Sequence, residues 1–180
     1  GDDPGAEEPP PDAPVFSRAG EVYELGPHRL VCGDSRDAAV WALLMGGAKA
    51  NVVFTSPPYA DRRAYDESSG FKPIPPDEYV AWWEPLQACV RDHIAADSSF
   101  FVNIKPSVTP DGTATELYVF DLVIAHARTW GWSLATEFCW KRTGVPKSVT
   151  RRFKNQFEPV YQFTRGAWKM RPEAVMHPSD

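Results

Sequence analysis

The sequence has few of the features that mark secreted, metal-binding or membrane-spanning proteins. Its three cysteines, Cys32, Cys89 and Cys139, lie far apart and form no C-x-x-C pair, which is typical of reduced thiols and unlike a disulfide framework or a structural zinc site. Neither a long apolar run nor a basic segment followed by an apolar one is present, so no membrane span and no secretory signal are predicted. We therefore expect a cytoplasmic protein without a metal site.

Basic residues are outnumbered overall: 19 Lys and Arg residues stand against 24 Asp and Glu residues, which gives a formal net charge of −5. Residues 1–14 contain five acidic residues and no basic one, together with several prolines. Such a composition cannot bury enough apolar surface to offset the entropy of ordering. Residues 1–21 are therefore predicted to form a disordered linker, and the folded part is expected to cover residues 22–180.

The stretch 141–171 has the opposite balance, with nine basic residues, a single acidic one, Glu158, and five interleaved aromatic residues. The phosphates of nucleic acids attract such a segment, although an ordinary solvated surface would have the same composition. If the segment binds DNA, the residues expected to contact it are Lys141, Arg142, Lys147, Arg151, Arg152 and Lys154.

The hydrophobic pattern alternates between strands and helices. Apolar or alternating stretches predict strands, and apolar residues at helical spacing predict helices, with Ser35 and Asp77 as caps. The expected strands cover residues 28–32, 52–54, 98–105, 132–142 and 157–165, and the expected helices cover residues 36–47, 78–94 and 116–131. Strands that alternate with helices favour a single α/β domain, with a mostly parallel sheet and helices on both faces.

The strongest chemical signal is the motif Thr55-Ser56-Pro57-Pro58-Tyr59, which directly follows the apolar run at 52–54. Sheets of α/β proteins bind ligands at the carboxyl ends of their strands. The two prolines fix the backbone and remove two N–H donors, so the carbonyl groups of the turn are left as acceptors. Ser56 adds a hydroxyl group, and Tyr59 adds a flat aromatic face. These groups suit an amino group on a planar ring, although a purely structural turn could have the same residues.

The motif resembles the [Asp/Asn/Ser]-Pro-Pro-[Tyr/Phe] motif of the DNA amino-methyltransferases, whose Ser form is typical of the members that modify cytosine N4. The segment RLVCGDS, at 29–35, resembles the Gly-Asp-Ser segment that precedes this motif in the permuted (beta) class. The resemblance covers residues 23–171. It implies a Rossmann-like methyltransferase sheet, S-adenosylmethionine as the cofactor, double-stranded DNA as the substrate, and a bacterial or phage enzyme of restriction and modification.

The resemblance also implies roles for individual residues. Asp34 would accept a hydrogen bond from the adenine amino group of S-adenosylmethionine, or would merely cap a helix. Ser56 and the Pro57 carbonyl would hold the amino group of a flipped base, and Tyr59 would stack on that base. Catalysis would come mainly from positioning the base for direct methyl transfer. The expected catalytic residues are Ser56, Pro57, Pro58 and Tyr59, and the expected cofactor-binding residues are Asp34, Ser35 and Thr55.

One expected feature of the permuted class is missing. That class carries a Phe-x-Gly-x-Gly loop for the amino-acid end of the cofactor, whereas the twelve glycines here include no G-x-G pair. We therefore expect an incomplete sheet, with the loop supplied by a missing C-terminal part or by a second polypeptide. Two alternatives stay open: adenine N6 as the target, or a non-catalytic nucleic-acid-binding module.

The basic segment leads to a first testable prediction. In the full polypeptide that the gene encodes, replacing Arg151 and Arg152 with Ala should weaken DNA binding. It should also flatten the salt dependence by about one counterion for each phosphate interaction that is removed. Fluorescence anisotropy across a salt series measures both quantities. The affinity for S-adenosylmethionine should stay unchanged, whereas an unaltered salt slope would assign both arginines to a solvated surface.

Overall fold

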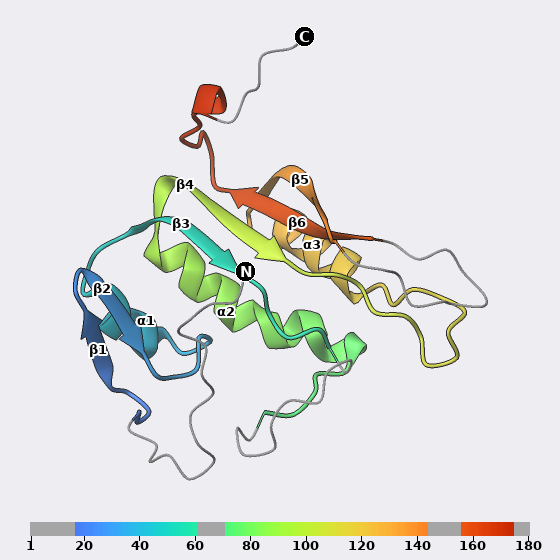
Figure 1. Ribbon diagram of the computed structural model, residues 1–180, viewed down its shortest axis with the longest axis horizontal. Coiled ribbons are helices and arrows are strands. Elements are labelled where there is room, and N and C mark those ends of the chain that lie inside the picture. Colours follow the sequence, from blue (N-terminus) through green and yellow to red (C-terminus); the bar gives the residue numbers. More distant parts are fainter. Residues whose placement is uncertain (1–16, 61–70, 144–155, 175–180) are drawn as a thin grey trace.

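The computed structural model describes residues 17–60, 71–143 and 156–174. Its strands are Val22–Leu25 (β1), His28–Val31 (β2), Ala50–Thr55 (β3), Ile94–Asn103 (β4), Ser133–Lys141 (β5) and Phe157–Thr164 (β6). Its α-helices are Ala38–Met45 (α1), Tyr79–His93 (α2) and Tyr118–Arg128 (α3), and short 3-10 helices cover Pro76–Glu78 (η2) and Pro172–Ala174 (η3) (Figure 1). The predicted strands and helices are thus confirmed in kind and order. Across the described ranges, no helix combines the length and hydropathy that a bilayer crossing requires.

Among the described residues, the main sheet has four strands in the order β3-β4-β6-β5. β3 is parallel to β4, whereas β6 is antiparallel to both β4 and β5. Strands β3, β4 and β5 therefore run in one direction, as helical crossovers through α2 and α3 require. The α/β class is confirmed, but a mostly parallel sheet is not. Among the described residues the single reversed strand lies in the middle of the sheet, so it makes two of the three strand pairings antiparallel.

The first strands form a separate hairpin. β2 pairs with β1 in an antiparallel two-stranded sheet and not with the main sheet. Helix α1 follows, and its N-cap is Asp37, whose carboxylate accepts a hydrogen bond from the Ala39 N–H at 2.8 Å. The predicted cap Ser35 is therefore wrong by two residues. The helix ends at Gly46, which adopts a left-handed conformation (φ 54°) that glycine tolerates well.

Helix α2 begins after the 3-10 helix η2, which contains Asp77. The predicted cap at Asp77 is also wrong, because the N-cap residue of α2 is Glu78 and it makes no side-chain capping bond. The helix continues through Pro85. Its first two turns carry Tyr79 and Trp83, two of the largest fully buried side chains among the described residues.

Helices α2 and α3 pack on the same side of the main sheet (Figure 1). Trp83 of α2 stacks near Phe100 of β4, with 6.3 Å between ring centroids, and His126 of α3 stacks on Phe163 of β6 at 4.2 Å. Phe100 and Phe163 are register partners, so the two helices meet over one pair of sheet residues. Burial of these large rings stabilises the packing of the helices on this face.

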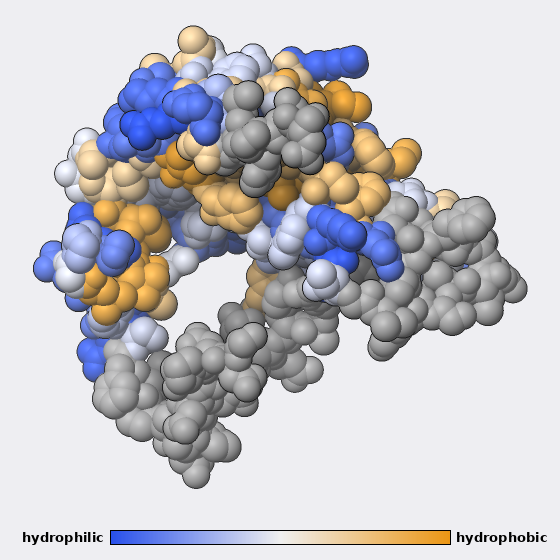
Figure 2. Space-filling model, turned by 45° about the horizontal axis from the view of Figure 1, so that its top comes forward, coloured by the Kyte–Doolittle hydropathy of each residue, from blue (hydrophilic) through white to orange (hydrophobic). Residues whose placement is uncertain are grey.

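The other face of the main sheet carries an aromatic row. Phe101 contacts Phe54 on one side and Phe138 on the other, with centroid distances of 6.4 and 6.1 Å. Phe54 is 64% exposed and Phe138 is 47% exposed, and Figure 2 shows hydrophobic side chains open to solvent on several parts of the described surface. The expected burial of the strand at 52–54 is therefore correct only for Val53, which packs against the core. Helices on both faces were expected, but within the described ranges α2 and α3 share one face.

His126 is fully buried between the two helices and the sheet. Its Nε2 accepts a hydrogen bond from the Trp83 indole N–H at 3.2 Å, so its Nδ1–H donates to the Leu122 carbonyl at 2.9 Å. Burial lowers the pKa of His126 from 6.5 to about 4, because the charged imidazolium would lose its hydration. The folded protein therefore holds this ring neutral.

This histidine makes the stability of the fold depend on pH. The unfolded chain binds a proton near pH 6.5 and the folded chain only near pH 4. The contribution of His126 is therefore complete above pH 6.5 and is lost as the pH falls toward 4, by about 3 kcal/mol. Urea unfolding between pH 7.5 and 4.5 measures this loss. His126→Gln should flatten the dependence, and His28→Gln, at an exposed position, is the control. An equally steep loss in His126→Gln would contradict the assignment.

Candidate active site

The strand directions bring one end of each of the four strands to the same edge of the main sheet. β3, β4 and β5 finish there, and the antiparallel β6 starts there. A cleft of about 370 Å³ opens at this edge. Its lining residues are Ser56, Pro57, Pro58, Tyr59, Asn103, Trp140, Arg142 and Glu158. The four residues predicted to be catalytic thus lie in one cleft, together with residues from the other three strands or their ends.

The Ser-Pro-Pro-Tyr turn is anchored to helix α2. The Tyr79 hydroxyl donates a hydrogen bond of 2.6 Å to the Pro58 carbonyl, so this carbonyl has a structural partner. Pro57 is buried, whereas Ser56 is exposed and Tyr59 is half-buried. The turn therefore fixes its backbone through the prolines and leaves the serine hydroxyl and the tyrosine ring at the cleft.

Asn103, the last residue of β4, lies beside Ser56. The Ser56 hydroxyl donates to Asn103 Oδ1 across 3.5 Å, a long hydrogen bond. The Asn103 amide is oriented by its other end, because Nδ2 donates to the Pro159 carbonyl at 3.0 Å. A serine hydroxyl has one hydrogen and two lone pairs. With its hydrogen directed to Asn103, Ser56 can accept a hydrogen bond from a ligand.

Glu158, near the start of β6, is the buried charge of the cleft, with a side chain only 7% exposed. Its Oε2 accepts a hydrogen bond from the Tyr59 hydroxyl at 3.1 Å. Its Oε1 binds Nη1 of Arg142 at 2.8 Å, and the arginine side chain is 57% exposed. The carboxylate is thus satisfied by one neutral donor from the turn and one cation from the cleft rim.

The cleft also contains Asn103, Trp140 and Glu158, which were not predicted as site residues from the sequence. Two of them have a feature in the sequence that could have indicated a site. Glu158 is the only acidic residue between 141 and 171, and Asn103 is a polar residue near the end of an apolar strand. Trp140 had none. It reaches the cleft because it is the register partner of Glu158 across β5 and β6, and the register of two strands far apart in sequence is not encoded locally.

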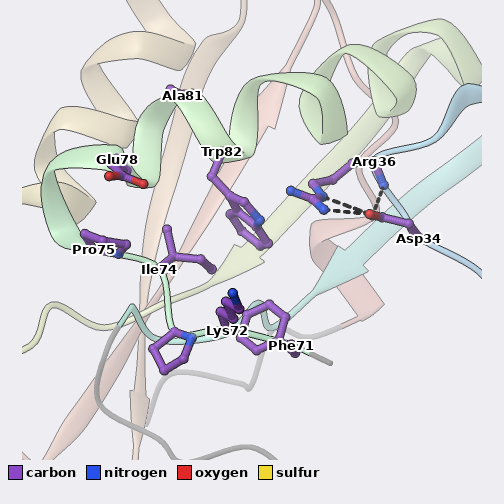
Figure 3. Close-up of a pocket in the computed structure, with 10 residues that line it drawn as sticks. Asp34, Arg36, Phe71, Lys72, Ile74, Pro75, Glu78, Ala81 and Trp82 are labelled. Atoms are coloured by element: carbon purple, nitrogen blue, oxygen red, sulfur yellow. Dashed lines mark hydrogen bonds and ion pairs between the residues drawn. The ribbon is translucent and has the colours of Figure 1, made fainter. Parts of the chain in front are cut away.

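A second cleft, of about 670 Å³, contains Asp34 (Figure 3). Arg36 clamps the Asp34 carboxylate: Nη2 lies 2.6 Å from Oδ2, and the Arg36 backbone N–H donates to Oδ1 at 2.9 Å. The side-chain hydrogen bonds from Arg36 lower the pKa of Asp34. The guanidinium also lies 5.3 Å from the ring centre of Trp82, within range of a cation–π contact. Phe71 and Ile74 add apolar lining.

The other two predicted cofactor residues are placed differently. Ser35 is exposed, and its backbone carbonyl accepts a hydrogen bond from the Trp41 indole at 2.7 Å. Thr55 ends β3, directly before the Ser-Pro-Pro-Tyr turn. Neither residue lines the Asp34 cleft. Tyr79 connects the two clefts, because its hydroxyl binds Pro58 and its ring lies 5.4 Å from Trp82.

The predicted DNA-binding residues are only partly described. Lys141 and Arg142 are exposed at the end of β5, beside the first cleft. Lys147, Arg151, Arg152 and Lys154 lie outside the described residues. Farther along the same basic segment, Arg165 donates to the Arg91 carbonyl at 2.9 Å and Lys169 pairs with Asp97 at 2.8 Å. These two follow the far end of β6, roughly 25 Å from its start, so the described basic residues of the segment lie near opposite ends of β6.

Residues 50–179 match the family model of the DNA methylases that modify amino groups (N6_N4_Mtase, described as DNA methylase). The match covers more than half of the chain and includes the whole first cleft. The chain therefore belongs to the DNA amino-methyltransferase family, as its Ser-Pro-Pro-Tyr turn predicted.

Particular relatives resemble parts of this chain. The type II methyltransferase M.MwoI of Methanothermobacter wolfeii is 32% identical over 120 residues, which are 63% of this chain and 17% of that protein. The structure of the PvuII DNA methyltransferase (cytosine-N4-specific) aligns with a TM-score of 0.57 at 23% identity, over 77% of this chain and 49% of the other. TTHA0409 of Thermus thermophilus aligns with a TM-score of 0.50 at 18% identity, over 81% and 60%. The chain thus spans 17% of the relative M.MwoI and about half of the PvuII enzyme.

The clamp on Asp34 can be tested in solution. Arg36→Gln should raise the pKa of Asp34 toward its ordinary value, because the charged partner that favours the carboxylate is removed. Carbon-13 NMR titration of the aspartate carboxyl groups measures this change. Arg29→Gln is the matched control, since Arg29 donates to the Leu44 carbonyl and not to a carboxylate. If the Asp34 titration is the same in Arg36→Gln as in the unmodified chain, the clamp is not populated.

Proposed function

We propose that this protein transfers a methyl group from S-adenosylmethionine to the exocyclic amino group of a flipped base in double-stranded DNA, with cytosine N4 as the target. The observation that carries the proposal is the first cleft, where an acceptor hydroxyl and an aromatic ring lie on one anchored turn. The family of the chain supports the reaction class. The position of the cleft at the carboxyl edge of the sheet supports a ligand site.

The Asp34 cleft fits the adenosine part of the cofactor. It combines a carboxylate, which can accept a hydrogen bond from an adenine amino group, with the rings of Phe71 and Trp82, which suit a planar base. Arg36 donates three N–H groups to the carboxylate, with Nε shared between the two oxygens, so one of its roughly four acceptor positions stays available. When bound, S-adenosylmethionine supplies an activated methyl group on its sulfonium.

The base is held by the first cleft. The amino nitrogen of cytosine has a lone pair that is delocalised into the ring, so its hydrogens must be held for the lone pair to turn toward an incoming methyl group. Ser56 and the Pro57 carbonyl are the acceptors proposed for these hydrogens, and Tyr59 is the stacking platform. Positive charge that develops on nitrogen is stabilised by the same acceptors.

The serine favours cytosine over adenine. Position 56 carries a hydroxyl where other members of the family have an acidic or amide side chain, and the serine form of the motif resembles that of the cytosine-N4 members. Lys141 and Arg142 at the rim of the cleft are proposed to contact phosphates of the DNA backbone, which bring the target strand to the turn without reading its sequence.

The chemical proposal predicts the product and its dependence on Ser56. In the full polypeptide that the gene encodes, Ser56→Ala should lower the methyl-transfer rate by about one to three powers of ten, roughly 1.4 kcal/mol of barrier for each. Cofactor affinity should stay unchanged. Tritium transfer from labelled S-adenosylmethionine gives the rate, and mass spectrometry of digested DNA identifies the modified nucleoside. Ser133→Ala, at an exposed serine outside the cleft, is the control.

The outcomes show which base is modified and whether Ser56 takes part in the reaction. N4-methylcytosine with a slow Ser56→Ala variant supports the proposal. N6-methyladenine would overturn the cytosine assignment, and full activity in Ser56→Ala would remove Ser56 from the mechanism. DNA binding without any methylated nucleoside would favour the non-catalytic binding module instead.

A further inference from the structure

The buried carboxylate of Glu158 has no role in the proposed methyl transfer, yet it lies in the same cleft. A carboxylate that is 7% exposed is costly unless both of its oxygens have partners. One partner, Arg142, would be enough to neutralise its charge. The second partner is the hydroxyl at the tip of Tyr59, the ring proposed to carry the target base.

We propose that Glu158 is a positioning residue that holds the Tyr59 ring in place before the base arrives. This inference rests on the proposed function, because it deepens the role given there to Tyr59. It is carried by the juxtaposition of the two side chains, which come from the turn after β3 and from the central strand β6.

The two elements differ in how firmly they are held. Glu158 belongs to β6, which is paired with β5 on one side and with β4 on the other. Tyr59 belongs to a turn, outside the strands of the sheet. The backbone of the turn is tied down at Pro58 by Tyr79. A hydrogen bond at the far end of the Tyr59 side chain adds a second fixed point, and two fixed points restrict the swing of the side chain about its Cα–Cβ bond.

A ring that is already oriented makes base binding more favourable. Ordering a mobile side chain during binding costs free energy, and a side chain that is ordered beforehand avoids this cost. Methyl transfer is sensitive to orientation as well as to affinity. Removal of the hydrogen bond to Glu158 should therefore lower kcat for methylation, while the KM for S-adenosylmethionine stays unchanged.

Three variants separate positioning from a general structural role. Tyr59→Phe keeps the ring but removes the hydroxyl, and Glu158→Ala removes the acceptor. Glu158→Gln keeps an acceptor oxygen for Tyr59 but gives up the charge that faces Arg142. Glu137→Gln, at an exposed acidic residue of β5, is the control and should not change kcat.

The test uses the full polypeptide, unmethylated plasmid DNA and tritiated S-adenosylmethionine. Tyr59→Phe and Glu158→Ala should each lower kcat by about three- to tenfold, which corresponds to one ordinary hydrogen bond. The double variant should be no slower than about the slower single variant, because both changes break the same hydrogen bond. Glu158→Gln should stay within about threefold of the unmodified protein. Multiplicative losses in the double variant, or a Glu158→Gln loss as large as that of Glu158→Ala, would overturn the proposal.

A second measurement does not depend on catalysis. With 3-fluorotyrosine at position 59 alone, the fluorine-19 signal should move toward that of exposed fluorotyrosine in Glu158→Ala and should stay near its original position in Glu158→Gln. An unchanged signal in Glu158→Ala would overturn the positioning role. If the unmodified protein transfers no methyl group, the proposed function fails, and the fluorine signal still decides whether Glu158 orients Tyr59. Circular dichroism melting curves show whether each variant is folded.

Discussion

The pairing of β6 with both β4 and β5 is the constraint on which the rest of the structure depends. Because β6 runs against its neighbours, its first residues lie where the other strands end. Glu158 is thereby placed opposite Trp140 and within reach of the Ser-Pro-Pro-Tyr turn. The same strand also carries Phe163, which supports the buried His126 on the helical face. One reversed strand thus links the core to the cleft.

The two faces of the sheet have opposite environments, although both are aromatic. On the helical face, Trp83, Phe100 and His126 are fully buried, and each polar ring atom of His126 has a partner. On the other face, Phe54 and Phe138 remain largely exposed. The hydrophobic pattern of the strands does not show which face is buried, because both faces have large apolar residues at alternate positions.

Local chemistry was predictable from the sequence, and long-range register was not. The candidate site could be predicted from an apolar strand that stops at Ser56, Pro57, Pro58 and Tyr59. Prolines end a strand whatever the rest of the fold, because they lack the N–H donor that strand pairing needs. The strand positions followed from alternation, but the direction and order of β6 depend on pairings between distant segments. Glu158 and Trp140 therefore escaped prediction. The N-cap predictions were wrong because Ser35, Asp37 and Asp77 are all residue types that can cap a helix. The tertiary structure decides where each helix begins.

The first cleft offers neutral acceptor groups near Ser56, because its buried carboxylate is already paired. Glu158 is the acidic side chain that lines this cleft, and both of its oxygens are used, one by Arg142 and one by Tyr59. A ligand amino group at Ser56 would therefore meet hydroxyl, carbonyl and amide oxygens rather than a free carboxylate. In the proposed reaction, fixed dipoles of this kind stabilise a charge that develops on nitrogen, and they need no reorganisation at the moment of transfer. Arg142 pairs with Glu158 at the rim of the cleft, so in the proposed mechanism the carboxylate orients Tyr59 without repelling the phosphates of a DNA strand.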